Sequence, residues 1–348
     1  MRGKAGRLVN AAVVLLVLNP AAGLAAEPGL RPIELTTKPI DRFLQTRSDH
    51  QFGQLEFRGG LELISTDRQF GSLSGIDFSP DGSVLYAVSD KGRWFAARPV
   101  MEGGRLVGLE DTGIGPILNN AGEPLSGKRW GDAEGLRIIE RDGEPLALVS
   151  FEGANDLRAF TGAEFAASRS VDVPLPASTN EVDRNAGFEG LAVAPASSPL
   201  QGGIVLLAEH SLDASDNHRG WIIGGPRAGS FSLHRLDNYD VTDAAFLPDG
   251  DLLVLERQLG FPLGIAARIR RIASDDIRPG ATVGGEVLLE ADLRYQIDNM
   301  EGIAVGRGPD GETIIALVSD NNQSKLQRTL LLFFALTEER DSTAHTAE

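Results

Sequence analysis

The chain has 348 residues, contains no cysteine and carries a formal net charge of −16 at pH 7. Without cysteine it has no disulfide, no thiolate nucleophile and no thiolate metal ligand. A surface this acidic disfavours binding to nucleic acid or anionic lipid and attracts cations.

The first 26 residues have the pattern of a secretory signal peptide. Basic residues Arg2, Lys4 and Arg7 precede an apolar run at 11–18, and small residues follow up to Ala26. This order of charged, apolar and small regions is typical of a cleaved export signal. No later stretch reaches the ~20 apolar residues that a membrane helix needs. We therefore expect a periplasmic or secreted protein without membrane insertion.

Five copies of one sequence pattern follow. In each copy a small or acidic residue opens an apolar strand, a turn follows, and a second apolar strand ends near a charged residue. The copies open at Ser74, Glu134, Glu189, Thr242 and Glu301. A repeat of roughly 50 residues is typical of propellers and other repeat arrays. The first copy has four short strand segments, expected at 75–78, 84–88, 94–98 and 106–110.

The two ends of the repeat region complete one another. The fifth copy has only three strand segments, and an unassigned apolar segment at 60–64 precedes the first copy. Pairing that segment with the last strand would close a ring without an exposed edge. We therefore predict an all-β fold, a β-propeller with five blades whose ring is closed by an N-terminal outer strand. Six blades, with a degenerate blade near 98–130 or 210–240, are the alternative.

These boundaries divide the chain into four parts. Residues 1–26 are the signal peptide, 27–56 an N-terminal peripheral segment, 57–337 the propeller domain and 338–348 a polar tail. No pattern indicates a coiled coil, so we expect a monomer.

Acidic residues recur at equivalent positions of the copies. The residues that open the first strand form one ring around the expected channel, and those that close the second strand form another. Because the two strands are antiparallel, both rings should meet at one mouth of the channel. The second ring contains Asp90, Glu152, Glu209, Glu256 and Asp320.

Carboxylates crowded at one mouth need a cation, a shared proton or basic partners. Oxygen ligands without cysteine favour calcium, with magnesium as the alternative. In a second interpretation, the same carboxylates cap strand ends or form ion pairs that hold neighbouring blades together. The predicted metal ligands are Asp90, Asp132, Glu209, Glu256 and Asp320.

Three copies open with a Glu-Gly pair that is followed by Leu or Ile. Glycine allows a close backbone approach, so the preceding glutamate should point into the channel. We predict Glu134, Glu189 and Glu301 as catalytic residues, together with His210, the histidine best placed to act as acid or base. A serine-hydrolase elbow and a phosphate-binding glycine loop are both absent from the sequence.

Six segments carry a combination of motifs, namely 73–76, 89–93, 132–136, 187–191, 299–303 and 319–322. Together they resemble the phytase-like family, which is also described as having esterase-like activity of phytase. The resemblance covers about residues 57–337 and implies a secreted or periplasmic β-propeller, with phosphoester hydrolysis as one implied activity. By analogy with calcium-dependent β-propeller phytases, it implies that the acidic rings hold calcium and that Lys91, Arg93 and Arg257 contact substrate phosphate.

Three functions follow as hypotheses. The first is an exported hydrolase that acts on small phosphomonoesters or esters with a divalent metal at the acidic channel mouth. The second is a lactonase or carboxylester hydrolase on the same scaffold. The third is a propeller without enzymatic activity that binds a ligand or another protein.

Overall fold

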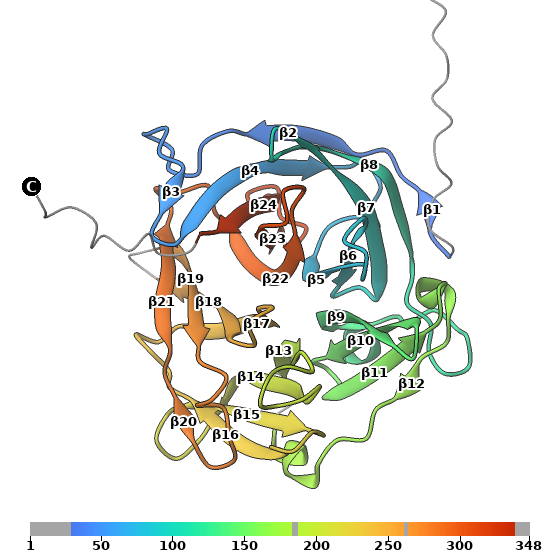
Figure 1. Ribbon diagram of the computed structural model, residues 1–348. Helices are drawn as coiled ribbons and strands as arrows, with labels where there is room; N and C mark the ends of the chain where they lie inside the picture. The colour runs from blue at the N-terminus through green and yellow to red at the C-terminus, as the bar shows by residue number, and fades with distance from the viewer. Residues whose placement is uncertain (1–28, 183–186, 261–263, 338–348) are drawn as a thin grey trace, which may run out of the picture.

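The computed structural model describes residues 29–182, 187–260 and 264–337, and within them the chain forms 24 strands. The strands lie in five sheets arranged as blades around a central axis (Figure 1). The expected signal peptide and polar tail lie outside the described residues. In the described ranges no helix has the length and apolar character needed to cross a membrane.

Each blade is a sheet whose strands follow one another from the central axis outward. The first contains β5 (Leu73–Phe78), β6 (Leu85–Ser89), β7 (Arg93–Glu102), β8 (Arg105–Pro116) and β1 (Arg31–Pro32). The second contains β9 (Ala133–Arg141), β10 (Glu144–Phe151), β11 (Asp156–Thr161) and β12 (Val171–Asp172). The third contains β13 (Phe188–Val193), β14 (Ile204–Leu212), β15 (His218–Ile223), β16 (Gly229–Leu233) and β20 (Thr282–Val283).

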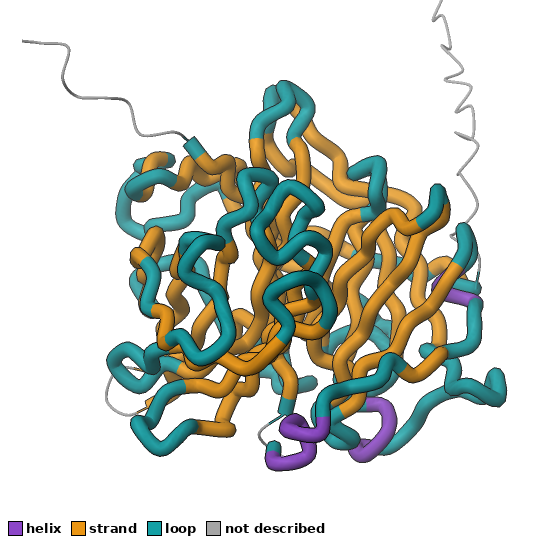
Figure 2. The backbone as a smooth tube through the Cα atoms, turned by 60° about the horizontal axis from the view of Figure 1, so that its bottom comes forward, coloured by secondary structure: helices purple, strands orange, loops and turns teal. Residues whose placement is uncertain are grey.

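The remaining two blades are formed by the C-terminal half and by N-terminal strands. The fourth contains β17 (Asp240–Phe246), β18 (Leu252–Gly260), β19 (Gly264–Ile272) and β21 (Glu286–Asp292). The fifth contains β22 (Asn299–Arg307), β23 (Thr313–Asp320), β24 (Thr329–Leu336), β4 (Leu55–Ile64) and β2 (Thr36–Ile40), and β3 (Gln51–Phe52) pairs with β4. The helical segments α1 (Lys128–Gly131), η1 (Phe165–Ala167) and η2 (Ala177–Glu181) are short and lie between strands (Figure 2).

The innermost strands confirm a propeller of five blades. Each of β5, β9, β13, β17 and β22 contacts the next, and β22 contacts β5 again. The two candidate stretches for a sixth blade instead contribute strands to the first and third blades. The four strands expected in the first copy correspond to β5, β6, β7 and β8.

The fifth blade combines the two ends of the repeat region. Strand β4 pairs antiparallel with β24, with Leu61 opposite Leu331, and is the fourth strand of this blade. The N-terminal segment continues around the outside of the ring, where β2 pairs with β4 and β1 pairs with β8. It is anchored by Phe43, whose side chain is fully buried.

Apolar clusters between neighbouring blades form the core. Trp94 of the first blade and Phe160 of the second lie edge to face, with ring centroids 5.3 Å apart. Phe78 of the first blade packs against Phe333 of the fifth in the same way. Strands covered on both faces are expected to be nearly continuous apolar runs. Burial between the blades therefore stabilises the ring without disulfides.

A buried arginine closes the centre of the ring. Arg137 of β9 is 4% exposed and donates hydrogen bonds to the carbonyl oxygens of Ile76 (2.9 Å), Ala244 (3.0 Å) and Ile303 (2.9 Å). Its guanidinium also forms an ion pair with the fully buried Asp243 at 2.8 Å. One side chain thus connects the second blade with the first, fourth and fifth.

The glycine of the Glu-Gly pairs is required by close contact between innermost strands. A Cβ atom at Gly302 would collide with the carbonyl oxygen of Ser74 on the neighbouring blade and lie 2.9 Å from Val318 Cγ1. We expect Gly302→Ala to lower the free energy of unfolding by about 1–3 kcal/mol, because overpacked sites must shift their surroundings. Chemical denaturation measures this loss.

Gly284→Ala is the matched control, since Gly284 is exposed and a Cβ atom there would meet no atom within 4 Å. Equal stabilities of the two variants would contradict the packing argument.

Candidate functional site

A polar cavity of about 640 Å³ opens at one end of the central axis. All five blades contribute side chains to it, and we call it the acidic mouth. It brings together most of the residues that the sequence singled out, namely Asp90, Lys91, Arg93, Asp132, Glu134, Glu189, Glu209, Arg257, Glu301 and Asp320. Glu152, a member of the second predicted ring, also lines it.

A β-bulge lies at the first ring in each blade, and four of the five ring residues line the mouth, Thr242 of the fourth blade being the exception. In the third blade Phe188 lies opposite Ala208 and Gly190 opposite Leu207, so Glu189 is the extra residue. Register shifts at the matching place of the other four blades fall on Ser74, Glu134, Thr242 and Glu301. A bulge bends its strand and re-aims a side chain. The residue before the glycine therefore faces the cavity instead of a neighbouring sheet.

The second ring differs from the prediction in the fourth blade. Asp240 pairs with Arg257 there, as Asn299 pairs with Asp320 in the fifth blade, so Arg257 occupies the ring position. Glu256 does not line the mouth. Because successive side chains of a strand point to opposite faces, a shift of one residue moves a side chain to the other face.

Glu256 is instead fully buried beside Arg270. Its Oε2 accepts a hydrogen bond of 2.7 Å from Arg270 Nε, and a second contact makes the ion pair bidentate. This ion pair joins two strands of the same blade, not two neighbouring blades, and it turns the Glu256 carboxylate away from the mouth.

Arg257 connects three blades at the mouth. Its Nη2 lies 2.9 Å from Glu209 Oε1, and Nη1 donates a hydrogen bond of 2.7 Å to Asn299 Oδ1. It also forms an ion pair with Glu301, which accepts a hydrogen bond of 2.6 Å from Asn299 Nδ2. Burial still raises the pKa of Glu301 to about 7 despite the opposing charge of Arg257.

His210 lies beside the mouth and does not line it. Its side chain is 51% exposed, with Nδ1 3.0 Å from Glu209 Oε2 and Nε2 3.5 Å from Asp240 Oδ2. The hydrogen bond to Glu209 raises the pKa of His210. Burial works to raise the pKa of Glu209, but the His210 hydrogen bond and the charge of Arg257 hold it below its usual value. His210 and Arg257 therefore fix Glu209 from two sides.

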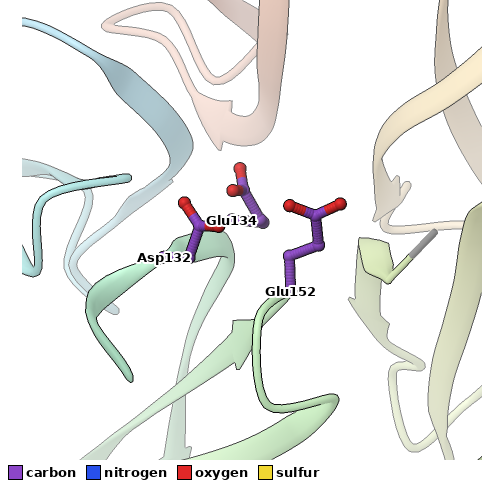
Figure 3. Close-up of side chains that lie close together, drawn as sticks. All are labelled: Asp132, Glu134 and Glu152. Carbon is purple, nitrogen blue, oxygen red and sulfur yellow. The ribbon is translucent and has the colours of Figure 1, made fainter. Parts of the chain in front are cut away.

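Two sets of carboxylates come close together in the mouth. Asp132, Glu134 and Glu152 form the first set (Figure 3), and Glu152, Glu189 and Glu209 form the second. Within each set, one oxygen from every residue lies within 4.8 Å of the others. Asp132 is 4% exposed, and its Oδ2 has no hydrogen-bond partner among the described residues.

Burial and mutual repulsion raise the pKa values of these carboxyls. Burial, helped by the charge of Glu152, raises the pKa of Asp132 to about 7. Burial and neighbouring carboxylates raise the pKa values of Glu134 and Glu189 well above the usual range. When ionised, these carboxylates repel one another, and a cation bound between them would reduce that repulsion.

Basic side chains line another part of the cavity wall. Lys91, Arg93 and Lys128 face the mouth, and none of them forms an ion pair with a residue in the described part of the chain. Lys128 belongs to α1, in the connection between the first and second blades, and it has no counterpart in the other repeats. The repeat pattern therefore gave no signal for it.

Comparison with known proteins identifies one family. A model of the family described as "Phytase-like: Esterase-like activity of phytase" matches residues 68–323. A search of curated proteins found no match to the chain.

Solved structures of propeller proteins are similar at low identity. The endo-arabinase from Bacteroides thetaiotaomicron VPI-5482 is 12% identical over 78% of this chain and 95% of its own, with a TM-score of 0.47. A thermostable family-43 glycoside hydrolase is 11% identical over 76% and 89%, with a TM-score of 0.47. Cellvibrio cellulosa alpha-L-arabinanase is 11% identical over 76% and 92%, with a TM-score of 0.44. These likenesses carry no information about the substrate of this chain.

The raised pKa values predict how stability depends on pH. In the folded state the pKa values of Asp132 and Glu301 are about 7, whereas a free carboxyl has a pKa of about 4. The folded state therefore holds protons that the unfolded state releases, and the free energy of unfolding should fall as pH rises from about 4 to about 7. Thermal unfolding in EDTA between pH 4.5 and 7.5 measures this slope.

Asp132→Asn should flatten the decrease in melting temperature, because its neutral amide does not titrate. Asp142→Asn, at an exposed turn outside the mouth, should keep the full decrease. A wild-type melting temperature that rises through this pH window would contradict the assignment.

Proposed function

Since the chain belongs to the phytase-like family, we propose that it is a hydrolase of phosphate monoesters that works with a divalent cation at the acidic mouth. The substrate is a small molecule, and the protein acts as a monomer. The N-terminal pattern of basic, apolar and small residues supports export to the periplasm or beyond.

The observation that carries the proposal is the presence of two kinds of unpaired charge in one cavity. Carboxylates without a basic partner gather around Asp132 and Glu152, while Lys91, Arg93 and Lys128 line the same space. A phosphate monoester is an anion that needs positive charge on several sides. Basic side chains supply part of that charge, and a cation held by the carboxylates supplies the rest.

The residues present fit a hard divalent cation. The two sets of side chains offer only carboxylate oxygens, which suit calcium, and magnesium as the alternative. The buried and unpartnered Oδ2 of Asp132 is an acceptor that a cation would satisfy. When bound, such an ion polarises a phosphoryl oxygen and lowers the pKa of water next to it.

Each group of side chains then has its own task. Lys91, Arg93 and Lys128 bind and orient the anionic group of the substrate. Burial and neighbouring carboxylates raise the pKa values of Glu134 and Glu189 well above the usual range, and a bound cation would bring both residues into the ionised form that can hold it.

Two predicted site residues have supporting tasks in this proposal. Arg257 is already bound to Glu209 and Glu301, so it positions these carboxylates instead of contacting phosphate. His210 lies outside the cavity and holds Glu209 from the solvent side.

Phosphate release tests the proposal. Purified mature protein is treated with EDTA and assayed on phytate and p-nitrophenyl phosphate, before and after calcium or magnesium is restored. We expect release that depends on the metal and falls by about 10²-fold or more in Asp132→Asn, as for the loss of other electrostatic groups in active sites. Asp142→Asn should retain wild-type release.

Other substrates separate the alternatives. Hydrolysis of p-nitrophenyl acetate or a lactone, without any phosphate release, would replace the proposal by the carboxylester or lactone hydrolase. No hydrolysis of any of these substrates with either metal would favour a propeller that only binds its ligand.

A further inference from the structure

We infer that the acidic mouth is built for two divalent cations side by side, and that Glu152 is the ligand they share. The inference rests on the proposed use of metal in this cavity and adds the number of ions and their common ligand. Glu152 was part of a predicted ring but not one of the predicted metal ligands.

The geometry of the two carboxylate sets carries the first step. Asp132, Glu134 and Glu152 bring one oxygen each within 4.8 Å of one another, and Glu152, Glu189 and Glu209 do the same. Glu152 is the member common to both sets. A carboxylate has two oxygens and can therefore offer one to each of two neighbouring ions.

The unsatisfied acceptor in the first set is a second and independent observation. Asp132 is only 4% exposed, and its Oδ2 lacks a hydrogen-bond donor among the described residues. Buried polar atoms in folded proteins are rarely left without a partner. Its carboxyl points toward Glu134 and Glu152 (Figure 3), so a cation between the three would supply the missing partner.

Charge balance favours two ions over one. Of the residues in the two sets, Glu209 is paired with Arg257. Asp132, Glu134, Glu152 and Glu189 have no ion pair in the described ranges. When ionised, these four carboxylates carry four negative charges, and Lys128 nearby adds one positive charge. One divalent cation would leave this group negative, whereas two would leave it positive, as the binding of an anionic substrate requires.

The neighbours of the two sets make the sites unequal. Glu209 in the second set also binds Arg257 and His210, so part of its negative charge is already compensated. The first set contains no residue with such an ion pair. Because calcium affinity rises with the uncompensated charge of the ligands, the first set should bind its ion more tightly.

Counting bound calcium tests the inference without using substrate. Metal-free mature protein is titrated with calcium by isothermal titration calorimetry, and native mass spectrometry counts the bound ions. We expect two ions in the wild type and one in Asp132→Asn or in Glu189→Gln. Glu152→Gln should weaken both sites by at least about tenfold, the usual effect of losing a group that supports a metal site.

Matched measurements keep the result interpretable. Asp142→Asn should still bind two ions, and circular dichroism shows whether each variant is folded. If a variant fails to fold, the wild-type count still decides between one ion and two.

Other outcomes would overturn the inference in distinct ways. One ion in the wild type would reject the two-ion centre but leave a metal-dependent hydrolase intact. Two ions of which Glu152→Gln removes only one would reject the shared ligand. No bound ion would reject the inference together with the metal proposal, whereas two bound ions without any phosphate release would reject the hydrolase alone.

Discussion

Arg137 of the second blade binds three other blades at the centre of the ring, and its partner Asp243 is fully buried. Removing one member of a buried ion pair leaves an uncompensated charge in a region of low dielectric constant, which commonly costs about 3–5 kcal/mol. The pair therefore fixes the distances between innermost strands. Since it reaches from the second blade to the first, fourth and fifth, the Arg137 side chain crosses the centre of the ring.

At the mouth, the bulges place carboxylates where an ordinary strand would not. Glu134, Glu189 and Glu301 each occupy the extra position of a bulge, directly before a glycine that packs against neighbouring atoms. The glycine permits the close approach of the strands, and the bulge aims the glutamate. The bulge at the Glu-Gly pair, repeated in three blades, therefore accounts both for the close packing of the innermost strands and for the carboxylates of the mouth.

Much of this arrangement could be predicted from the sequence, because blade strands are apolar runs with a regular period. The register at strand ends could not, since one residue decides which face a side chain occupies, and Arg257 instead of Glu256 faces the mouth. Lys128 lies in a connection between two blades that is not part of the repeat, so the repeat pattern could not predict its place in the mouth. Arg137 lies inside an apolar strand, and only the closed ring shows that its neighbours are carbonyl oxygens of other blades.

The strands of the fifth blade come from both ends of the described chain, so the order of synthesis affects when this blade can fold. Strand β4 is made early, but its partner β24 lies close to the end of the described chain. Contacts between residues so far apart in sequence form late, because a long loop must close before they contribute. While the ribosome is still at work, the first four blades can only form an open arc, and the carboxylates of the mouth remain spread along it. The acidic mouth is therefore complete only after β24 has been made and has paired with β4.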